Sequence, residues 1–305
     1  MLNENDINAR LTPNDALFNN IYIIQQKFNI VPDKDSHYGA SIDYQDISEL
    51  RNEFLTELYN SIVDWVYSSD KYKELREAAM KMGRSEAAAH AEVQRKAREK
   101  FRGNHTVEEL LMQGQLGELL LFHFIQRCQK AVPLLRKMKI TTSAHHERFG
   151  ADAIHFKYEN GKPLIILGEA KTYTSQYKFN AAFENAVNSI LTTYKNHKEE
   201  LNLYVHEDFL DKEMNEIAEA YLNNKLEGVE VHLVSIVVYD ETTNLNITNQ
   251  ADIRNQIEKI IKKRYENFDN TKIDIEHNAI LNRITYIVFP VWKLEELVRD
   301  FQNKL

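Results

Sequence analysis

Three charged residues, Asp152, Glu169 and Lys171, lie at the two ends of a segment whose sequence predicts a β-hairpin. Asn160 and Gly161 separate two apolar runs, and this dipeptide is the strongest short-range signal for a two-residue hairpin turn. In a hairpin with that turn, the two residue numbers of every facing pair have the same sum. Asp152 should therefore face Glu169. Because side chains alternate along a strand, Glu169, Lys171 and Asp152 should share one face. The sequence therefore predicts two carboxylates and one ammonium group in a small patch.

This patch suits metal-dependent cleavage of phosphodiesters. Facing carboxylates repel each other, and a cation between them relieves that repulsion. Mg²⁺ or Mn²⁺ fits, because such ions take a few carboxylate oxygens, keep waters and complete their shell with substrate phosphate. The ion polarises the phosphate and activates water, while a nearby ammonium stabilises developing charge. We expect Asp152, Glu169 and Lys171 to be catalytic, although Glu-x-Lys alone is common. The alternative is a turn residue after Gly150-Ala151 for Asp152, and a solvated strand face for Glu169 and Lys171.

Glu118 is a further candidate metal ligand, beside Asp152 and Glu169. It lies at the start of a helix that is too apolar for the surface, where an unpaired carboxylate would be costly. The alternative, a first-turn glutamate stabilised by the helix dipole, is equally open.

Histidines offer a weaker case for a zinc hydrolase. The spacing of His145, His146 and His155 matches no helical pair of zinc ligands, and His155 should face away from Asp152. His146, in the loop before Asp152, is instead a candidate for contact with DNA.

The densest basic cluster is a second candidate for contact with DNA. Lysine and arginine side chains hold the phosphate backbone, so a basic helix beside an acidic site would position the substrate. A solvated helix face is an equally open explanation of the run. Its basic residues are Arg95, Lys96, Arg98, Lys100 and Arg102.

Composition sets the broad class of protein. The 305 residues can bury a sizeable core, and a single cysteine excludes both an intramolecular disulfide and a cysteine-based zinc site. The polar N-terminus does not look like a secretion signal, and no apolar run is long enough to span a bilayer. We therefore expect a cytoplasmic protein with no membrane partner. The net charge of −8 still allows a local basic track.

The expected organisation is a mainly helical region over 1–103 and an α/β domain over 104–305. The first 45 residues are left unassigned. Apolar spacing predicts one helix over 48–69 and a second, capped by Asp70, that runs to Phe101. The later elements suit a single mixed sheet flanked by helices, with 229–239 as a central strand. They are helices at 115–129, 178–198, 251–265 and from Lys293, and strands at 134–140, 152–158, 164–171, 229–239 and 284–289.

Three short motifs resemble one known family. Gly117-Glu118-Leu119-Leu120, Gly150-Ala151-Asp152-Ala153-Ile154-His155 and Gly168-Glu169-Ala170-Lys171 are similar to HamA, the nuclease subunit of the Hachiman anti-phage defence system. The resemblance implies a restriction-endonuclease-like PD-(D/E)xK fold and metal-dependent DNA cleavage with little sequence preference. It also implies a superfamily 2 helicase partner, HamB.

By that resemblance, the family's catalytic set corresponds to Asp152, Glu169 and Lys171, with Glu118 as a helical ligand. The Pro-Asp of the superfamily name is Ala151-Asp152 here, and that proline is often absent. The rival interpretation is a non-catalytic subunit that keeps a nuclease-like sheet and docks to a helicase. A complete Asp, Glu and Lys set argues against this interpretation, because a site without catalytic activity would gain nothing from two carboxylates that face each other.

Overall fold

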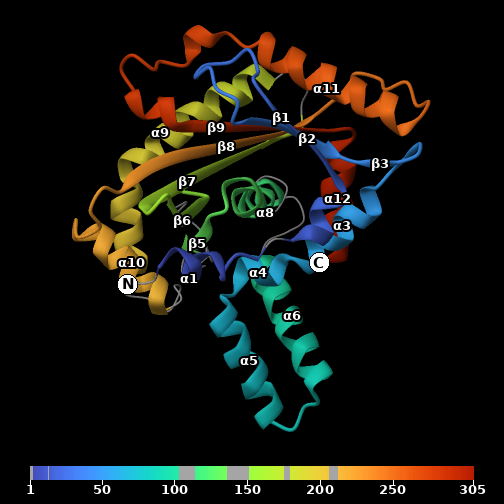
Figure 1. Ribbon diagram of the computed structural model, residues 1–305. Coiled ribbons are helices and arrows are strands. Elements are labelled where there is room, and N and C mark those ends of the chain that lie inside the picture. Colours follow the sequence, from blue (N-terminus) through green and yellow to red (C-terminus); the bar gives the residue numbers. More distant parts are fainter. Residues whose placement is uncertain (1–2, 13, 103–113, 136–150, 175–178, 206–211) are drawn as a thin grey trace.

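The computed structural model describes residues 3–12, 14–102, 114–135, 151–174, 179–205 and 212–305 (Figure 1). Its centre is a seven-stranded sheet, ordered β1-β2-β9-β8-β7-β6-β5. The strands in that order are β1 (Ile21–Gln26), β2 (His37–Ile42), β9 (Ile284–Val291), β8 (Glu230–Asp240), β7 (Lys162–Tyr173), β6 (Ala153–Glu159) and β5 (Val132–Leu135). Strands β3 (Tyr44–Gln45) and β4 (Ser48–Glu49) form a separate pair.

The sheet is mixed, as expected. Strands β2, β9, β8 and β7 run parallel to one another, whereas β1 pairs antiparallel with β2 and the β7-β6-β5 meander is antiparallel throughout. Strand β8 is fourth of the seven, which confirms the apolar run at 229–239 as the central strand. A strand with apolar residues on both faces suits this place, because helices cover both sides of it.

The β6-β7 hairpin has the predicted register. Pairs run from Glu159 with Lys162 to Ala153 with Gly168, and every pair has the predicted sum. Asn160 and Gly161 both have positive φ angles, 53° and 76°, as the predicted turn requires. The continuous pairing ends at the Ala153–Gly168 pair and does not include Asp152.

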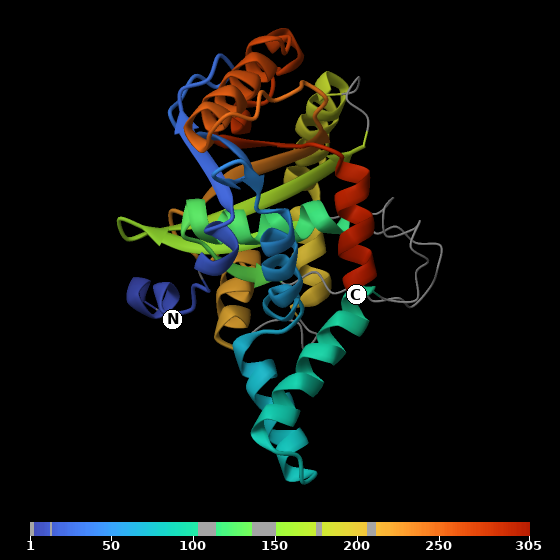
Figure 2. The same cartoon turned by 90° about the vertical axis from the view of Figure 1, so that its right-hand side faces the viewer.

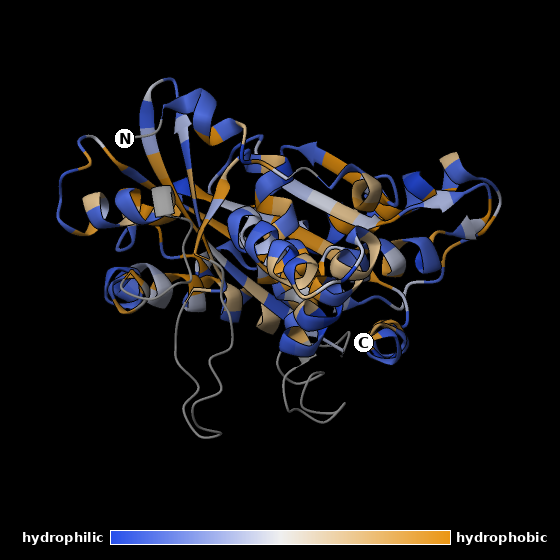
Figure 3. Cartoon of the chain, turned by 90° about the horizontal axis from the view of Figure 1, so that it is seen from below, coloured by the Kyte–Doolittle hydropathy of each residue, from blue (hydrophilic) through white to orange (hydrophobic). Residues whose placement is uncertain are grey.

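Helices cover both faces of the sheet (Figure 1). One apolar cluster joins one face to α9 (Phe179–Tyr204), α10 (Lys212–Leu222) and α11 (Gln250–Glu266). The other joins the opposite face to α3 (Arg51–Asn60), α4 (Ile62–Val66), α8 (Gln115–Phe124) and α12 (Leu294–Lys304). Hydrophobic residues follow the strands, and hydrophilic residues dominate the outer helices (Figure 3).

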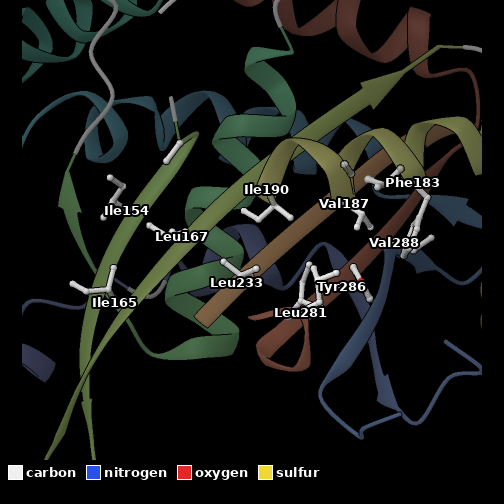
Figure 4. Packing of buried hydrophobic residues seen from close by; sticks show 14 of the residues in the cluster. Ile154, Ile165, Leu167, Phe183, Val187, Ile190, Leu233, Leu281, Tyr286 and Val288 are labelled. Carbon is white, nitrogen blue, oxygen red and sulfur yellow. The ribbon is translucent and has the colours of Figure 1, made fainter. Parts of the chain in front are cut away.

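Helix α9 packs closely on the neighbouring strands β7, β8 and β9. Ile190 lies over Leu233 of β8, and Phe183 lies near Tyr286 of β9 (Figure 4). All four side chains are buried. This packing fixes the position of the polar residues that α9 also turns toward the sheet.

The region before residue 103 is less uniform than expected. It supplies β1 and β2 to the central sheet, from the segment that the sequence left unassigned. The helix expected over 48–69 is β4 followed by α3 and α4, which are separated at Ser61. Two short helices, α1 (Glu4–Asn8) and α2 (Asp15–Phe18), precede β1.

The helix expected from Asp70 to Phe101 is in fact two helices. Helices α5 (Ser69–Lys81) and α6 (Glu86–Arg102) form a hairpin that projects away from the sheet (Figures 1 and 2). Gly83 has a φ of +90°, a conformation that ends a helix and that glycine adopts at little cost. The N-cap is Ser68 rather than Asp70, because the Ser68 hydroxyl accepts the Lys71 N–H at 3.1 Å.

The remaining elements largely match expectation. Helix α8 continues as a π-helical turn (Ile125–Gln129), which confirms a helix over 115–129. Strand β5 covers the start of the run expected at 134–140, and residues 136–140 lie outside the described residues. The sequence did not predict α10 or the 3₁₀ turns Asn270–Lys272 and Ala279–Arg283. Within the described ranges, no helix is long and apolar enough to cross a membrane.

Candidate functional site

Glu169 and Lys171 lie on the face of β7 that is covered by α9. Residues of β7 alternate between the two apolar clusters, and Leu167 belongs to the cluster that contains α9. Glu169 and Lys171 follow Leu167 at intervals of two, so they share its face. The Lys171 ammonium donates to Oε1 of Glu169 over 2.8 Å. This ion pair is largely enclosed, since the Glu169 side chain is 5% exposed and that of Lys171 28%.

Two hydroxyl groups of α9 hold the same carboxylate. The Ser189 hydroxyl donates to Oε1 of Glu169 at 2.6 Å, and the Thr193 hydroxyl donates to Oε2 at 3.0 Å. Both oxygens of Glu169 therefore accept hydrogen bonds. A buried carboxylate needs such partners, because leaving it unsatisfied away from water costs several kcal/mol.

Asp152 lies beside this pair, but it is not the cross-strand partner of Glu169. The Asp152 N–H donates to the carbonyl of Gly168 at 3.1 Å, and its Oδ2 accepts the Ala170 N–H at 2.9 Å. The chain bends at Asp152, so the hairpin ladder stops one pair short of the expected Asp152–Glu169 pair. The side chain nevertheless reaches the backbone next to Glu169, and the expected convergence of the charged groups is present.

The two carboxylates influence each other electrostatically. Burial raises the pKa of Glu169, and the negative charge of Asp152 raises it further, against the opposing effects of Lys171 and the Ser189 hydrogen bond. Burial by itself would lower the pKa of Lys171. The charge and hydrogen bond of Glu169, together with Asp152, outweigh that effect and raise the pKa of Lys171. Both members of the ion pair thus hold protons more tightly than in water.

This arrangement is compatible with a divalent cation. Asp152 and Glu169 supply hard oxygen ligands whose repulsion a cation would relieve, and Mg²⁺ typically takes one or two carboxylates. In the part of the chain that the structure describes, no group of three or more His, Cys, Asp or Glu side chains is arranged to hold a metal. Any ion bound here would therefore depend on water or substrate for most of its shell.

Glu118 lies in the first turn of α8, on the opposite side of β7 from Glu169. The neighbouring Gly117 lies so close to Ala170 and Thr172 that an added Cβ would be 2.4 Å from the Thr172 hydroxyl. Glu118 is buried, at 9% exposure. The structure does not group it with the two site carboxylates, and its role as a metal ligand stays a prediction.

The histidines considered for zinc are not gathered at the site. His155 is buried against Phe122 of α8, with ring centroids 5.6 Å apart. It therefore lies on the face of the sheet opposite to Glu169. His145 and His146 lie outside the described residues, as does any contact of His146 with DNA.

The basic residues of α6 are largely engaged within the hairpin. Arg95 forms an ion pair with Glu99 one turn along, and the Lys96 ammonium lies 2.8 Å from a carboxylate oxygen of Glu92. Helix α6 also contributes to the apolar cluster on the face opposite to Glu169. These facts favour the solvated-face explanation for this part of the track.

Two further basic residues lie over aromatic rings. The Arg98 guanidinium is 3.9 Å from the centre of the Tyr59 ring, and the Lys100 ammonium is 5.0 Å from that of Tyr67. Arg102 is the last residue of α6, and its side chain lies outside the described ones. DNA binding by the α6 track stays a prediction.

Sequence reasoning missed the polar residues around Glu169. Ser189 and Thr193 are four residues apart on α9, and Ser235 is the register neighbour of Glu169 on β8, buried on the same face. Glu200 of α9 accepts the Ala151 N–H at 2.6 Å, directly before Asp152. The spacing of small polar residues on α9 was the available signal, but only its packing on β7 identifies their partner.

Comparison with known proteins identifies the family. No curated protein matches the sequence significantly. The family model of HamA matches residues 16–305, which is nearly the whole chain. The chain therefore belongs to the HamA family of the Hachiman defence system.

Proposed function

We propose that this protein is a divalent-metal-dependent deoxyribonuclease of the PD-(D/E)xK type. The observation that carries the proposal is the largely enclosed Glu169–Lys171 ion pair, with Asp152 bound to the intervening Ala170 N–H. Placing these charges together is costly, because Glu169 is buried and Asp152 and Lys171 are partly buried. Strongly perturbed charged groups gather at functional sites more often than elsewhere, so this cost supports a catalytic role.

Each residue has a specific task in this proposal. Asp152 and Glu169 would hold Mg²⁺ or Mn²⁺, and the bound ion would supply charge stabilisation at the phosphate and a water of lowered pKa. Lys171 keeps its proton, because the neighbouring carboxylates raise its pKa. Its ammonium donates hydrogen bonds toward negative charge that develops on the phosphate. Ser189 and Thr193 orient the Glu169 carboxylate.

Family membership supports the biological setting. A HamA protein belongs to Hachiman defence, which favours foreign DNA as the substrate and a HamB-like superfamily 2 helicase as the partner. Contacts to phosphate carry no sequence information, so a site of this composition fits cleavage with little sequence preference. The rival is a subunit that only docks to the helicase and does not cut.

The test is cleavage of plasmid DNA by the purified chain, with Mg²⁺ or Mn²⁺ and with EDTA. Glu169→Gln and Lys171→Met should abolish nicking, since one removes a metal ligand and the other removes the ammonium. The matched control is the Lys157–Glu159 ion pair of β6, which has the same spacing but lies at the hairpin tip. Glu159→Gln and Lys157→Met should cut like the wild type. A wild type that binds its helicase but never cuts would favour the docking subunit.

A further inference from the structure

Helix α9 touches both halves of the candidate site through one polar stripe. Ser189, Thr193 and Glu200 are spaced by four and seven residues. At about 100° per residue, these positions lie within about 40° of each other around the helix. The stripe borders the apolar face that buries α9 against the sheet. Ile190 belongs to that apolar face (Figure 4).

The first half of the stripe fixes Glu169. Ser189 donates to Oε1 and Thr193 to Oε2, so the carboxylate cannot rotate without breaking one of these bonds. An ionised carboxylate offers about four acceptor positions. The hydroxyls and Lys171 together therefore set its plane and still leave room for a further ligand.

The second half of the stripe fixes the segment that carries Asp152. A carboxylate oxygen of Glu200 accepts the Ala151 N–H at 2.6 Å, and Glu200 is itself buried. Asp152 then turns its Oδ2 to the Ala170 N–H, one residue from Glu169. One helix thus binds the Glu169 carboxylate directly and the residue before Asp152 through its backbone.

We propose that Ser189, Thr193 and Glu200 are positioning residues, which set the separation of Asp152 and Glu169 that a divalent cation requires. The proposal rests on the metal-dependent function proposed above. Partners that orient metal ligands typically change metal affinity by about 10–100-fold when they are removed. Groups that merely satisfy buried polar atoms would change stability without a selective change in metal affinity.

Thr193 allows the sharpest test, because the neighbouring Thr192 is exposed and donates to the carbonyl of Asn188, which makes it a matched control. Thr193→Val removes the hydroxyl at nearly constant shape, and Thr193→Ser restores it. We expect Thr193→Val to bind Mn²⁺ about 10–100-fold more weakly in calorimetry, with Thr193→Ser and Thr192→Val close to the wild type. Ser189→Ala is the second variant, because Ser189 is only partly buried and its loss should disturb folding less.

Glu200 is tested in the same way. Glu200→Ala leaves the Ala151 N–H without this acceptor, whereas Glu200→Gln keeps an acceptor oxygen at the same place. The exposed Glu199 provides the control Glu199→Ala. We expect weaker Mn²⁺ binding in Glu200→Ala alone, and melting in EDTA will report any separate loss of stability.

The outcomes separate this inference from the proposed function. Metal binding and cleavage by the wild type, with unchanged Mn²⁺ affinity in Thr193→Val, Ser189→Ala and Glu200→Ala, would overturn the inference and leave the nuclease intact. Failure of Thr193→Ser to restore affinity would also overturn it. A wild type that neither binds Mn²⁺ nor cuts DNA would refute the proposed function, and the inference with it.

Discussion

The Lys171 ammonium donates to Oε1 of Glu169 at 2.8 Å from the same face of β7, two residues further along the strand. The contact is mostly enclosed, so neither charge is fully hydrated. If either partner is removed, the remaining charge is incompletely hydrated and has lost its counter-ion, which is unfavourable. The ion pair therefore links the stability of the fold to the charges of the site.

Lys171→Met should destabilise the metal-free protein at pH 8, because the Glu169 carboxylate loses a charged donor. We expect a loss of about 1–3 kcal/mol in the free energy of unfolding, measured by urea denaturation in EDTA. Adding Glu169→Gln to this variant should recover part of the loss, since the buried charge is then absent. Lys27→Met, at the exposed Lys27–Asp33 ion pair, should change stability little. Equal losses at both lysines would mean that enclosure of the Glu169 pair has no energetic effect.

Stability in EDTA should depend on pH through Glu169. Its pKa is raised above the ordinary value of 4.5, so the folded protein keeps a proton that the unfolded chain releases. The resulting stabilisation is complete below the ordinary pKa and is lost as the pH rises through the raised one. Glu169→Gln cannot titrate, so its melting temperature relative to the wild type should rise across that window.

Glu159 provides a control of opposite sign for that pH series. A hydrogen bond from Lys157 lowers the pKa of Glu159. The ionised Glu159 therefore stabilises the folded protein at higher pH, and this stabilisation is lost as the pH falls. The melting temperature of Glu159→Gln should therefore fall relative to that of the wild type as the pH rises. If both variants changed in the same direction with pH, the assigned shift of Glu169 would be incorrect.

The basic track of α6 should contribute less to DNA binding than its sequence indicates. Arg95 is paired with Glu99, and Arg98 lies over Tyr59, so both must give up internal contacts to reach phosphate. If the track binds DNA, Arg95→Ala with Arg98→Ala should weaken binding evenly across sequences and reduce the salt slope by about 2. Fluorescence anisotropy over a salt series measures this, with the exposed Lys259→Ala of α11 as control. An unchanged slope would assign the track to the solvated surface.

Removal of residues 1–103 should not leave a stable domain. The truncation deletes β1 and β2, and it exposes the edge of β9 that pairs with β2. It also deletes Tyr38, whose carbonyl accepts the hydroxyl of the buried Tyr265. We expect insoluble or partly unfolded protein, seen as lost cooperativity in thermal melts. A truncated chain that melts cooperatively would make the boundary near 103 a true domain boundary.

Local sequence determined the parts of this protein that depend on turn chemistry and periodicity. Asn160-Gly161 set the hairpin register, and Ile253, Ile257 and Ile261 marked the buried face of α11. The apolar run around 229–239 indicated a central strand. These signals act between near neighbours in the chain, where the period of the backbone decides which side chains share a face.

Tertiary packing decided the rest. Ser189 and Thr193 meet Glu169 because α9 crosses β7, and the bend at Asp152 replaces an ideal cross-strand pair. Likewise, β2 joins the sheet beside β9, far away in sequence. Such contacts depend on how whole elements bury their apolar faces against each other, so no local pattern of residue types specifies which polar groups will meet.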